Sequence, residues 1–107
     1  MLKSLITTEE KNTRKLAPLH PGEILREEYM EPLGLSAGKV AKAAQVPRTR
    51  IERIVREEIG ITADTALRLG KVFGTTPEFW MNLQARYDLL VAKAALAGEM
   101  KGIKGIV

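Results

Sequence analysis

Prolines, glycines and hydroxyl side chains divide this chain into short segments, and each clearly bounded segment begins with the signals of a helix. The motif His-Pro-Gly-Glu at 20–23, Ser36, Pro47, Thr62 and Thr-Pro-Glu at 76–78 place a cap, a proline or an acid where a first helical turn favours one. Between these points no segment has the alternation of a half-buried strand. The sequence therefore predicts an all-α fold.

Five helices are predicted, at 21–31, 37–43, 47–57, 63–73 and 77–97. Gly74 and Gly98 stand where the last two helices are expected to stop. The inner face of the fourth helix is assigned to Ala63, Ala66, Leu67, Leu69, Gly70 and Phe73. We expect one domain at 18–97, whose last helix 77–97 mediates dimerisation, between a flexible arm at 1–17 and a flexible tail at 98–107.

Basic side chains are concentrated in one short stretch. The formal net charge is +4, from 17 basic and 13 acidic residues. Residues 36–56 hold six basic side chains and a single acid, Glu52, a local charge of +5 that leaves −1 for the remainder. A basic patch beside a near-neutral body is expected of a protein that binds phosphates. A solvated helix surface explains the same pattern, so charge alone leaves both interpretations open.

The predicted helix 47–57 is apolar on one side and charged on the other. With 100° between successive residues, one sector holds Pro47, Ile51, Ile54 and Val55. The opposite side holds Arg48, Thr49, Arg50, Glu52, Arg53, Arg56 and Glu57. One interpretation is a surface helix with i, i+4 ion pairs, Arg48–Glu52, Glu52–Arg56 and Arg53–Glu57. The other is a helix in the DNA major groove, where arginine binds guanine O6 and N7.

The segment before this helix favours DNA. A short capped helix, the turn Ala44-Gln45-Val46 and an arginine-rich helix form the layout of a helix-turn-helix. Residues near the amino-terminal end of the second helix reach furthest into the groove. Base contacts are therefore predicted for Arg48, Thr49 and Arg50, with Arg53 one turn deeper. Phosphate contacts are predicted for Arg56, Lys39 and Lys42.

The stretch from Leu35 to Ile54 resembles the Cro/repressor-like (XRE) helix-turn-helix family in its spacing of Ser36, Val40-Ala41, Gln45-Val46-Pro47 and Ile51. The flanks HPGEILREEYMEPLGLS (20–36) and GITADTALRLGKVFGTTPEFWMNLQARYDL (60–89) are similar to HigA antitoxins and virulence-associated protein I. The resemblance covers about residues 17–93. It implies a five-helix lambda repressor-like domain and a dimeric cytoplasmic antitoxin. Such a protein neutralises a HigB-type mRNA-cleaving toxin, binds its own palindromic operator and represses its own operon.

The resemblance places recognition-helix positions on Arg48, Thr49, Arg50 and Arg53, and backbone contacts on Ser36, Ala37 and Thr62. Gln45 stands where the family usually has glycine, so the turn needs either strain or a different geometry. Pro47 replaces the common serine cap. Position 37 is alanine, where many relatives have glutamine near a phosphate, and it is followed by Gly38. A stand-alone XRE-type regulator without a toxin is the alternative. A protein-binding module whose arginines meet an acidic partner is a further one.

The last predicted helix has two apolar stripes. One contains Phe79, Trp80, Leu83, Tyr87, Leu90, Val91 and Ala94 and is expected to close the core. The second contains Met81, Ala85, Leu89, Ala92 and Leu96 and is predicted to be a dimer interface. The alternative is that both stripes pack within this one small domain.

Nothing in the sequence indicates catalysis, a cofactor or a metal site. Cysteine is absent, and His20 is the single histidine, for which a role at a helix start is expected. Glu23, Glu27, Glu28 and Glu31 are interpreted as a solvated helix face. The polar N-terminus resembles no secretion signal, which predicts a cytoplasmic protein. The arm at 1–17 and the first helix are the candidates for contact with a toxin.

Overall fold

The computed structural model describes residues 18–107, and the arm expected at 1–17 lies outside them. The elements are α2 (Pro21–Ile24), η1 (Leu25–Met30), α3 (Ala37–Ala44), α4 (Arg48–Val55), α5 (Ala63–Phe73), α6 (Pro77–Ala95) and α7 (Ala97–Met100). The α2 segment runs directly into η1, a π-helix, so the two occupy the place of the first expected helix. No strand occurs among the described residues, and the all-α prediction is confirmed. None of their helices is long and apolar enough to span a membrane.

Local capping bonds explain where three of the helices begin. The hydroxyl of Ser36 accepts from the backbone N–H of Lys39 at 3.1 Å. Thr62 and Thr76 accept in the same way from the residues three positions on, at 3.3 and 3.1 Å. Pro47 behaves differently from the expectation, because it is the cap of α4 and the helix begins at Arg48.

The end of α4 comes earlier than the predicted Glu57. Glu57 has a φ of 64°, and Glu58 donates its N–H back to the carbonyl of Arg53 at 2.9 Å. This left-handed residue followed by a backward bond is a common way for a helix to end. Arg26 of η1 reinforces the end, since its guanidinium donates to the Val55 carbonyl and pairs with Glu57 at 3.5 Å.

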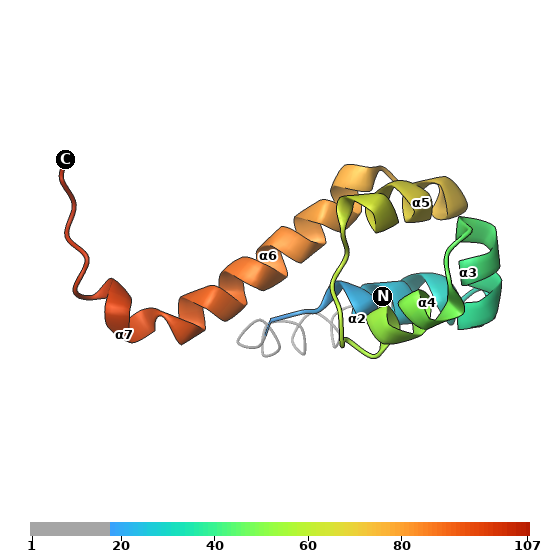
Figure 1. Ribbon diagram of the computed structural model, residues 1–107, viewed down its shortest axis with the longest axis horizontal. Coiled ribbons are helices and arrows are strands. Elements are labelled where there is room, and N and C mark those ends of the chain that lie inside the picture. The colour runs from blue at the N-terminus through green and yellow to red at the C-terminus, as the bar shows by residue number, and fades with distance from the viewer. Residues whose placement is uncertain (1–17) are drawn as a thin grey trace, which may run out of the picture.

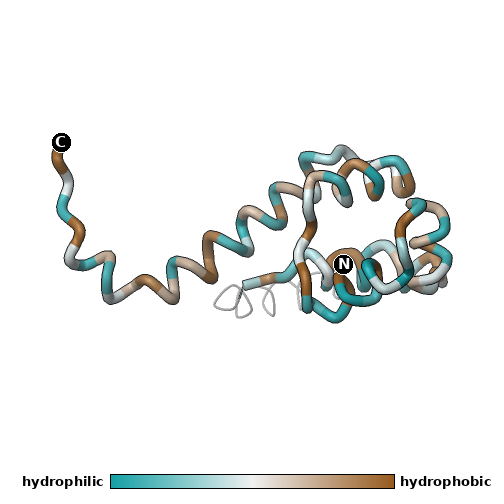
Figure 2. The backbone as a smooth tube through the Cα atoms, viewed as in Figure 1, coloured by the Kyte–Doolittle hydropathy of each residue, from teal (hydrophilic) through white to brown (hydrophobic). Residues whose placement is uncertain are grey.

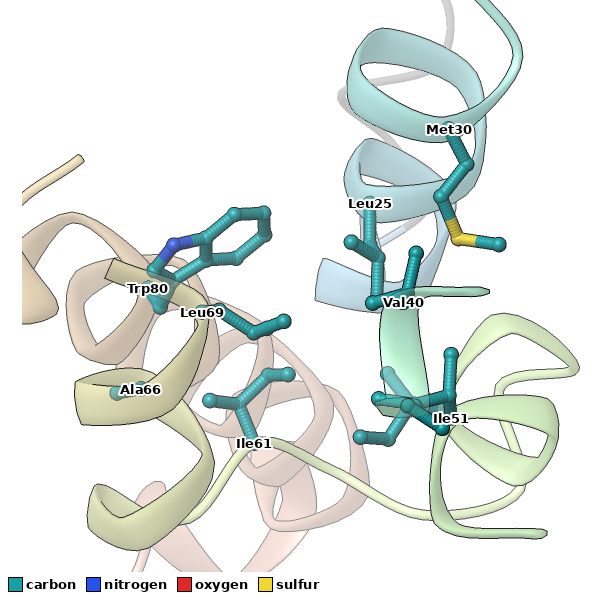
Figure 3. Packing of buried hydrophobic residues seen from close by; sticks show 10 residues of the cluster. Leu25, Met30, Val40, Ile51, Ile61, Ala66, Leu69 and Trp80 are labelled. Atoms are coloured by element: carbon teal, nitrogen blue, oxygen red, sulfur yellow. The ribbon is translucent and has the colours of Figure 1, made fainter. Parts of the chain in front are cut away.

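The core lies where α2, η1, α3, α4, α5 and the start of α6 meet (Figures 1 and 3). Its fully buried side chains include Trp80, Leu25, Ile51, Ile54, Leu69 and Val40. Each contributes about 1.5–3 kcal/mol by leaving water. The indole of Trp80 also donates to the Thr75 hydroxyl at 2.7 Å. The expected inner face of α5 is wrong at Ala63 and Leu67, which are exposed. At 100° per residue, both lie beyond one edge of the sector that holds the buried Thr65, Ala66, Leu69 and Gly70.

The apolar stripes of α6 have different surroundings. Trp80 is buried and Phe79, Leu83, Tyr87 and Leu90 are partly buried, whereas Val91 and Ala94 are exposed. The core stripe therefore ends at Leu90. Every member of the second stripe is exposed, with Leu89 at 68%. The second half of α6 extends away from the helical body with apolar residues along it (Figures 1 and 2). The described part of this chain does not cover both stripes.

The expected stop at Gly98 is wrong. The long helix ends at Ala95, Leu96 leaves helical geometry, and Gly98 lies inside the short helix α7. A glycine costs a helix only about 1 kcal/mol relative to alanine, so it need not end one. The tail expected from residue 98 is thus helical as far as Met100, and all of it is exposed.

His20 caps α2, in agreement with its expected role at a helix start. Its Nδ1 accepts from the N–H of Gly22 at 2.9 Å, and its ring packs edge-on against Tyr87 at 4.7 Å between centroids. The side chain is buried, with Glu57, Asp88 and Arg26 close enough to act on its charge. Burial is the main cause that holds the pKa of His20 below its ordinary value of 6.5, with Glu57 and Asp88 opposing it.

The free energy of unfolding is expected to fall as the pH drops below 6.5. Unfolded chains then take up a proton at His20 that the folded protein resists, so acid favours unfolding. The loss begins near pH 6.5, the ordinary pKa of histidine, and grows as the pH falls towards the lower pKa of the folded protein. Urea titrations between about pH 7.5 and 5.5 measure it. His20→Asn keeps a capping oxygen without titrating, so the decline specific to wild type should vanish in that variant. Parallel curves for the two proteins would contradict the assignment.

Candidate nucleic-acid interface

The turn between α3 and α4 keeps the geometry of a glycine turn although it contains glutamine. Gln45 has φ 58° and ψ 48°, in the left-handed region. Its N–H and that of Val46 donate to the carbonyls of Lys42 and Ala41, at 3.3 and 3.0 Å. Of the two possibilities that the sequence left open, the turn therefore carries strain, about 1–2 kcal/mol for a residue with a Cβ.

Arg68 of α5 supports this turn from the outside. Its Nη1 donates to the carbonyl oxygens of Ala44 and Gln45, at 3.0 and 3.3 Å. These carbonyls lie at the end of α3, where helical partners run out. The spacing of Asp64 and Arg68 is a sequence signal for an ion pair within α5. No sequence signal points to the contact between Arg68 and the end of α3, which was missed.

The structure confirms that α4 has a buried apolar side and an outward charged side. Ile51 and Ile54 are fully buried, and Val55 is half-buried. Pro47 is exposed because it lies before the helix proper. The candidate base-reading residues Arg48, Thr49 and Arg53 are exposed, and the side chain of Arg50 is 36% exposed. Burial of the two isoleucines thus fixes which side of α4 faces outward.

Two arginines of α4 pair with carboxylates of the same helix or of the residues just after it. Arg48 pairs with Glu52 at 3.3 Å, as expected for an i, i+4 pair. Arg53 pairs with Glu58 at 3.4 Å instead of Glu57, because the chain turns left-handed at Glu57. Such exposed pairs contribute at most about 1 kcal/mol. They orient the guanidinium groups without preventing a stronger anion from replacing the carboxylate.

The amino ends of α3, α4 and α5 meet on one surface, which we call the three-helix surface. A Cβ built on Gly38 would lie 3.4 Å from Cδ of Arg48, so the side chain of Arg48, at the start of α4, packs beside the first turn of α3. Arg50 reaches the first turn of α5, where its Nη1 lies 2.8 Å from Oδ1 of Asp64. Helix amino ends attract anions because their N–H groups and dipoles point outward.

The structure places the predicted phosphate contacts in two groups. Ser36 and Thr62 are the caps of α3 and α5 on the three-helix surface, and Lys39 is exposed one turn into α3. Lys42 and Arg56 are also exposed but lie at the carboxyl ends of α3 and α4. The amino ends of the three helices thus carry Ser36, Thr62, Arg48, Thr49 and Arg50, whereas Lys42 and Arg56 lie at the opposite ends of α3 and α4. Among residues 18–107, no cluster of acids or histidine is suited to a metal.

Residues 27–80 match the helix-turn-helix family. The chain is 56% identical to virulence-associated protein I of Dichelobacter nodosus over 79 residues, 74% of this chain and 73% of that protein. It is 33% identical to antitoxin HigA-1 of Vibrio cholerae over 90 residues, 84% of this chain and 85% of the antitoxin. The chain belongs to the HigA antitoxin group of the helix-turn-helix family.

A solved structure of the same group has a similar fold. The Pseudomonas aeruginosa antitoxin HigA, solved with the higBA promoter, matches with a TM-score of 0.81 and 43% identity, over 84% of this chain and 99% of that one. The family match at 27–80 includes α3, α4 and α5, and so contains every predicted base and phosphate contact. The second stripe of α6, from Met81 onward, lies beyond it.

Proposed function

We propose that this protein is an antitoxin that also binds its own operator as a dimer and represses its own operon. The observation that carries the DNA half is the outward charged side of α4, set by burial of Ile51 and Ile54. The relatives support the assignment, since they include an antitoxin HigA solved with a promoter and antitoxin GraA in complex with its operator. The protein acts in the cytoplasm by binding and not as an enzyme, with no cofactor.

In the proposed complex α4 lies in the major groove. Arg48, Thr49 and Arg50 contact base edges near its amino end, and Arg53 does so one turn further. Phosphates on either side are bound by Ser36, Lys39, Lys42, Arg56 and Thr62. The helix caps suit this role because each presents a hydroxyl beside free N–H groups at the start of α3 and α5.

Dimerisation through the second stripe of α6 completes the operator-binding unit. Met81, Ala85, Leu89, Ala92 and Leu96 are all exposed, although an apolar stripe of this length is normally covered. Helix-turn-helix proteins commonly read two half-sites about 34 Å apart as two-fold dimers. Pairing of two such stripes would cover both and place one α4 at each half-site.

Leu89→Glu is expected to give monomers that keep their helicity and bind the operator at least about tenfold more weakly. A buried, unpaired charge at the stripe is costly in the dimer, whereas the 68% exposed position tolerates it in a monomer. Analytical ultracentrifugation and far-UV circular dichroism measure the two properties. Arg86→Glu, which adds negative charge on the polar side of α6, is the control. A Leu89→Glu protein that still sediments as a dimer would exclude this interface.

The antitoxin half of the proposal requires a cognate HigB-type mRNA-cleaving toxin. The first helix remains a candidate contact because Glu27, Glu28 and Glu31 are exposed along η1 and its end. The other candidate, the arm at 1–17, lies outside the described residues. Deletion of residues 1–17 and charge reversal of the three glutamates separate these two candidates in a toxin-binding assay.

The test combines a reporter fused to the DNA upstream of the gene with co-expression of the protein encoded beside it. The proposal expects the chain to lower reporter output and to restore growth to cells that express the neighbouring toxin. Repression without rescue favours a stand-alone regulator. If the chain neither lowers reporter output nor restores growth, the proposed function is rejected, and an acidic protein remains as the partner of the arginines. Affinity for duplex DNA that does not fall with salt would point the same way.

A further inference from the structure

Asp64 is an acid on the three-helix surface, where it lies among basic side chains. It lies in the first turn of α5, and its Oδ1 accepts from Nη1 of Arg50 and from Nε of Arg68, both at 2.8 Å. The hydrogen bond from Arg68, followed by that from Arg50, holds the pKa of Asp64 below its ordinary range. The carboxylate is therefore charged at neutral pH. An anion here repels DNA phosphates, so it needs a role that outweighs that repulsion.

The partners of Asp64 connect Arg50 to the framework of the helix-turn-helix. Arg68 binds Asp64 with Nε and the carbonyls of Ala44 and Gln45 with Nη1. One path of hydrogen bonds thus runs from the turn before α4 through Arg68 and Asp64 to the side chain of Arg50. The guanidinium of Arg50 is held relative to the backbone that carries it into the groove.

Arg50 keeps enough donors to bind a base while Asp64 holds it. A guanidinium has five N–H donors in a rigid plane. The contact with Asp64 engages Nη1, so Nε and Nη2 still offer the two donors that guanine O6 and N7 require. Arg48 and Arg53 also have carboxylate partners, but Glu52 and Glu58 belong to α4 or the residues just after it. Asp64 belongs to another helix.

We propose that Asp64 is a positioning residue that sets base specificity by holding Arg50 in one orientation. The proposal rests on DNA binding by the three-helix surface and deepens it. A fixed guanidinium meets guanine in one geometry and fits other bases badly, whereas a free one can turn to a nearby phosphate. Asp64 therefore raises the ratio of operator to non-specific affinity, and it does so partly by weakening non-specific binding.

The test measures affinity for the operator and for a scrambled duplex. The base pair that Arg50 reads is the one whose substitution no longer changes the operator affinity of Arg50→Ala. Asp64→Ala is expected to reduce the operator-to-scrambled ratio about tenfold while scrambled-DNA affinity stays equal or rises. Glu78→Ala removes the equivalent first-turn acid of α6 and should leave the ratio unchanged. Asp64→Asn, which keeps the shape and an acceptor oxygen, should fall between Asp64→Ala and wild type and serves if the alanine variant is poorly folded.

A double variant separates positioning from a general effect of charge. If Asp64 acts through Arg50, Arg50→Ala/Asp64→Ala has the same discrimination as Arg50→Ala alone. Independent, additive losses would overturn the proposal. So would an Asp64→Ala protein that keeps wild-type discrimination while Arg50→Ala loses it. A wild-type protein that binds operator and scrambled DNA equally would reject DNA reading itself, a result distinguishable from either of these.

Discussion

Gly22→Ala is expected to lower the free energy of unfolding by about 3 kcal/mol, the upper end for overpacking a core. A Cβ at this position would lie 1.8 Å from the carbonyl oxygen of Ile54 and 2.8 Å from its carbon. Both are backbone atoms, so no side chain can turn aside, and α2 must separate from α4. A domain of this size has only about 5–15 kcal/mol of stability in total, so the loss is severe.

Urea unfolding followed by circular dichroism measures the effect of Gly22→Ala. Gly98→Ala is the matched control, because Gly98 is helical and a Cβ there meets nothing within 4 Å. That variant should be neutral or more stable by up to about 1 kcal/mol. Because Gly22 packs against the last buried turn of α4, the first variant should also lose DNA binding. An unfolding curve within about 0.5 kcal/mol of wild type would contradict the packing described for α2.

Arg48→Ala/Arg50→Ala is expected to bind the operator at least about 30-fold more weakly, since each arginine–guanine contact discriminates by about 1–3 kcal/mol. The fold should persist, because the side chain of Arg48 is exposed, that of Arg50 is only partly buried, and their ion pairs contribute little. Fluorescence anisotropy with labelled operator and scrambled duplexes at one salt concentration measures both affinities. Lys71→Ala/Lys101→Ala removes equal charge outside α3 and α4 and serves as control. Equal losses in both double variants would show that charge alone matters.

The sequence predicts those features of the fold that depend on residues close together in the chain. The residue type and position of Ser36, Thr62 and Thr76 predict helix caps, and each does accept from the N–H three residues ahead. The outward side of α4 was predicted because its apolar residues recur at helical spacing, and packing did bury Ile51 and Ile54. These features depend on contacts within one helical turn or on the helical period itself.

The features that were missed depend on residues far apart in the chain. Arg68 reaches Ala44 across 24 positions, and Arg50 reaches Asp64 across 14. No periodicity predicts which helix ends meet. The contact of Arg68 with the turn before α4 and that of Asp64 with Arg50 could therefore be found only from the structure. The partner of Arg53 was wrong for a local reason, since a left-handed residue at Glu57 is uncommon and few sequence signals announce it.

The most direct measurement of base reading by α4 uses operator duplexes in which one guanine at a time is replaced by 7-deazaguanine, which lacks the N7 acceptor. For wild-type protein, at least one guanine in each half-site should give a loss of about fivefold to tenfold, the equivalent of one hydrogen bond. One of the two single variants, Arg48→Ala or Arg50→Ala, lacks the arginine that contacts this guanine. Operator binding by that variant should not change when the guanine is replaced. If no guanine matters to wild type, or if both variants lose as much as wild type does, these arginines do not read bases.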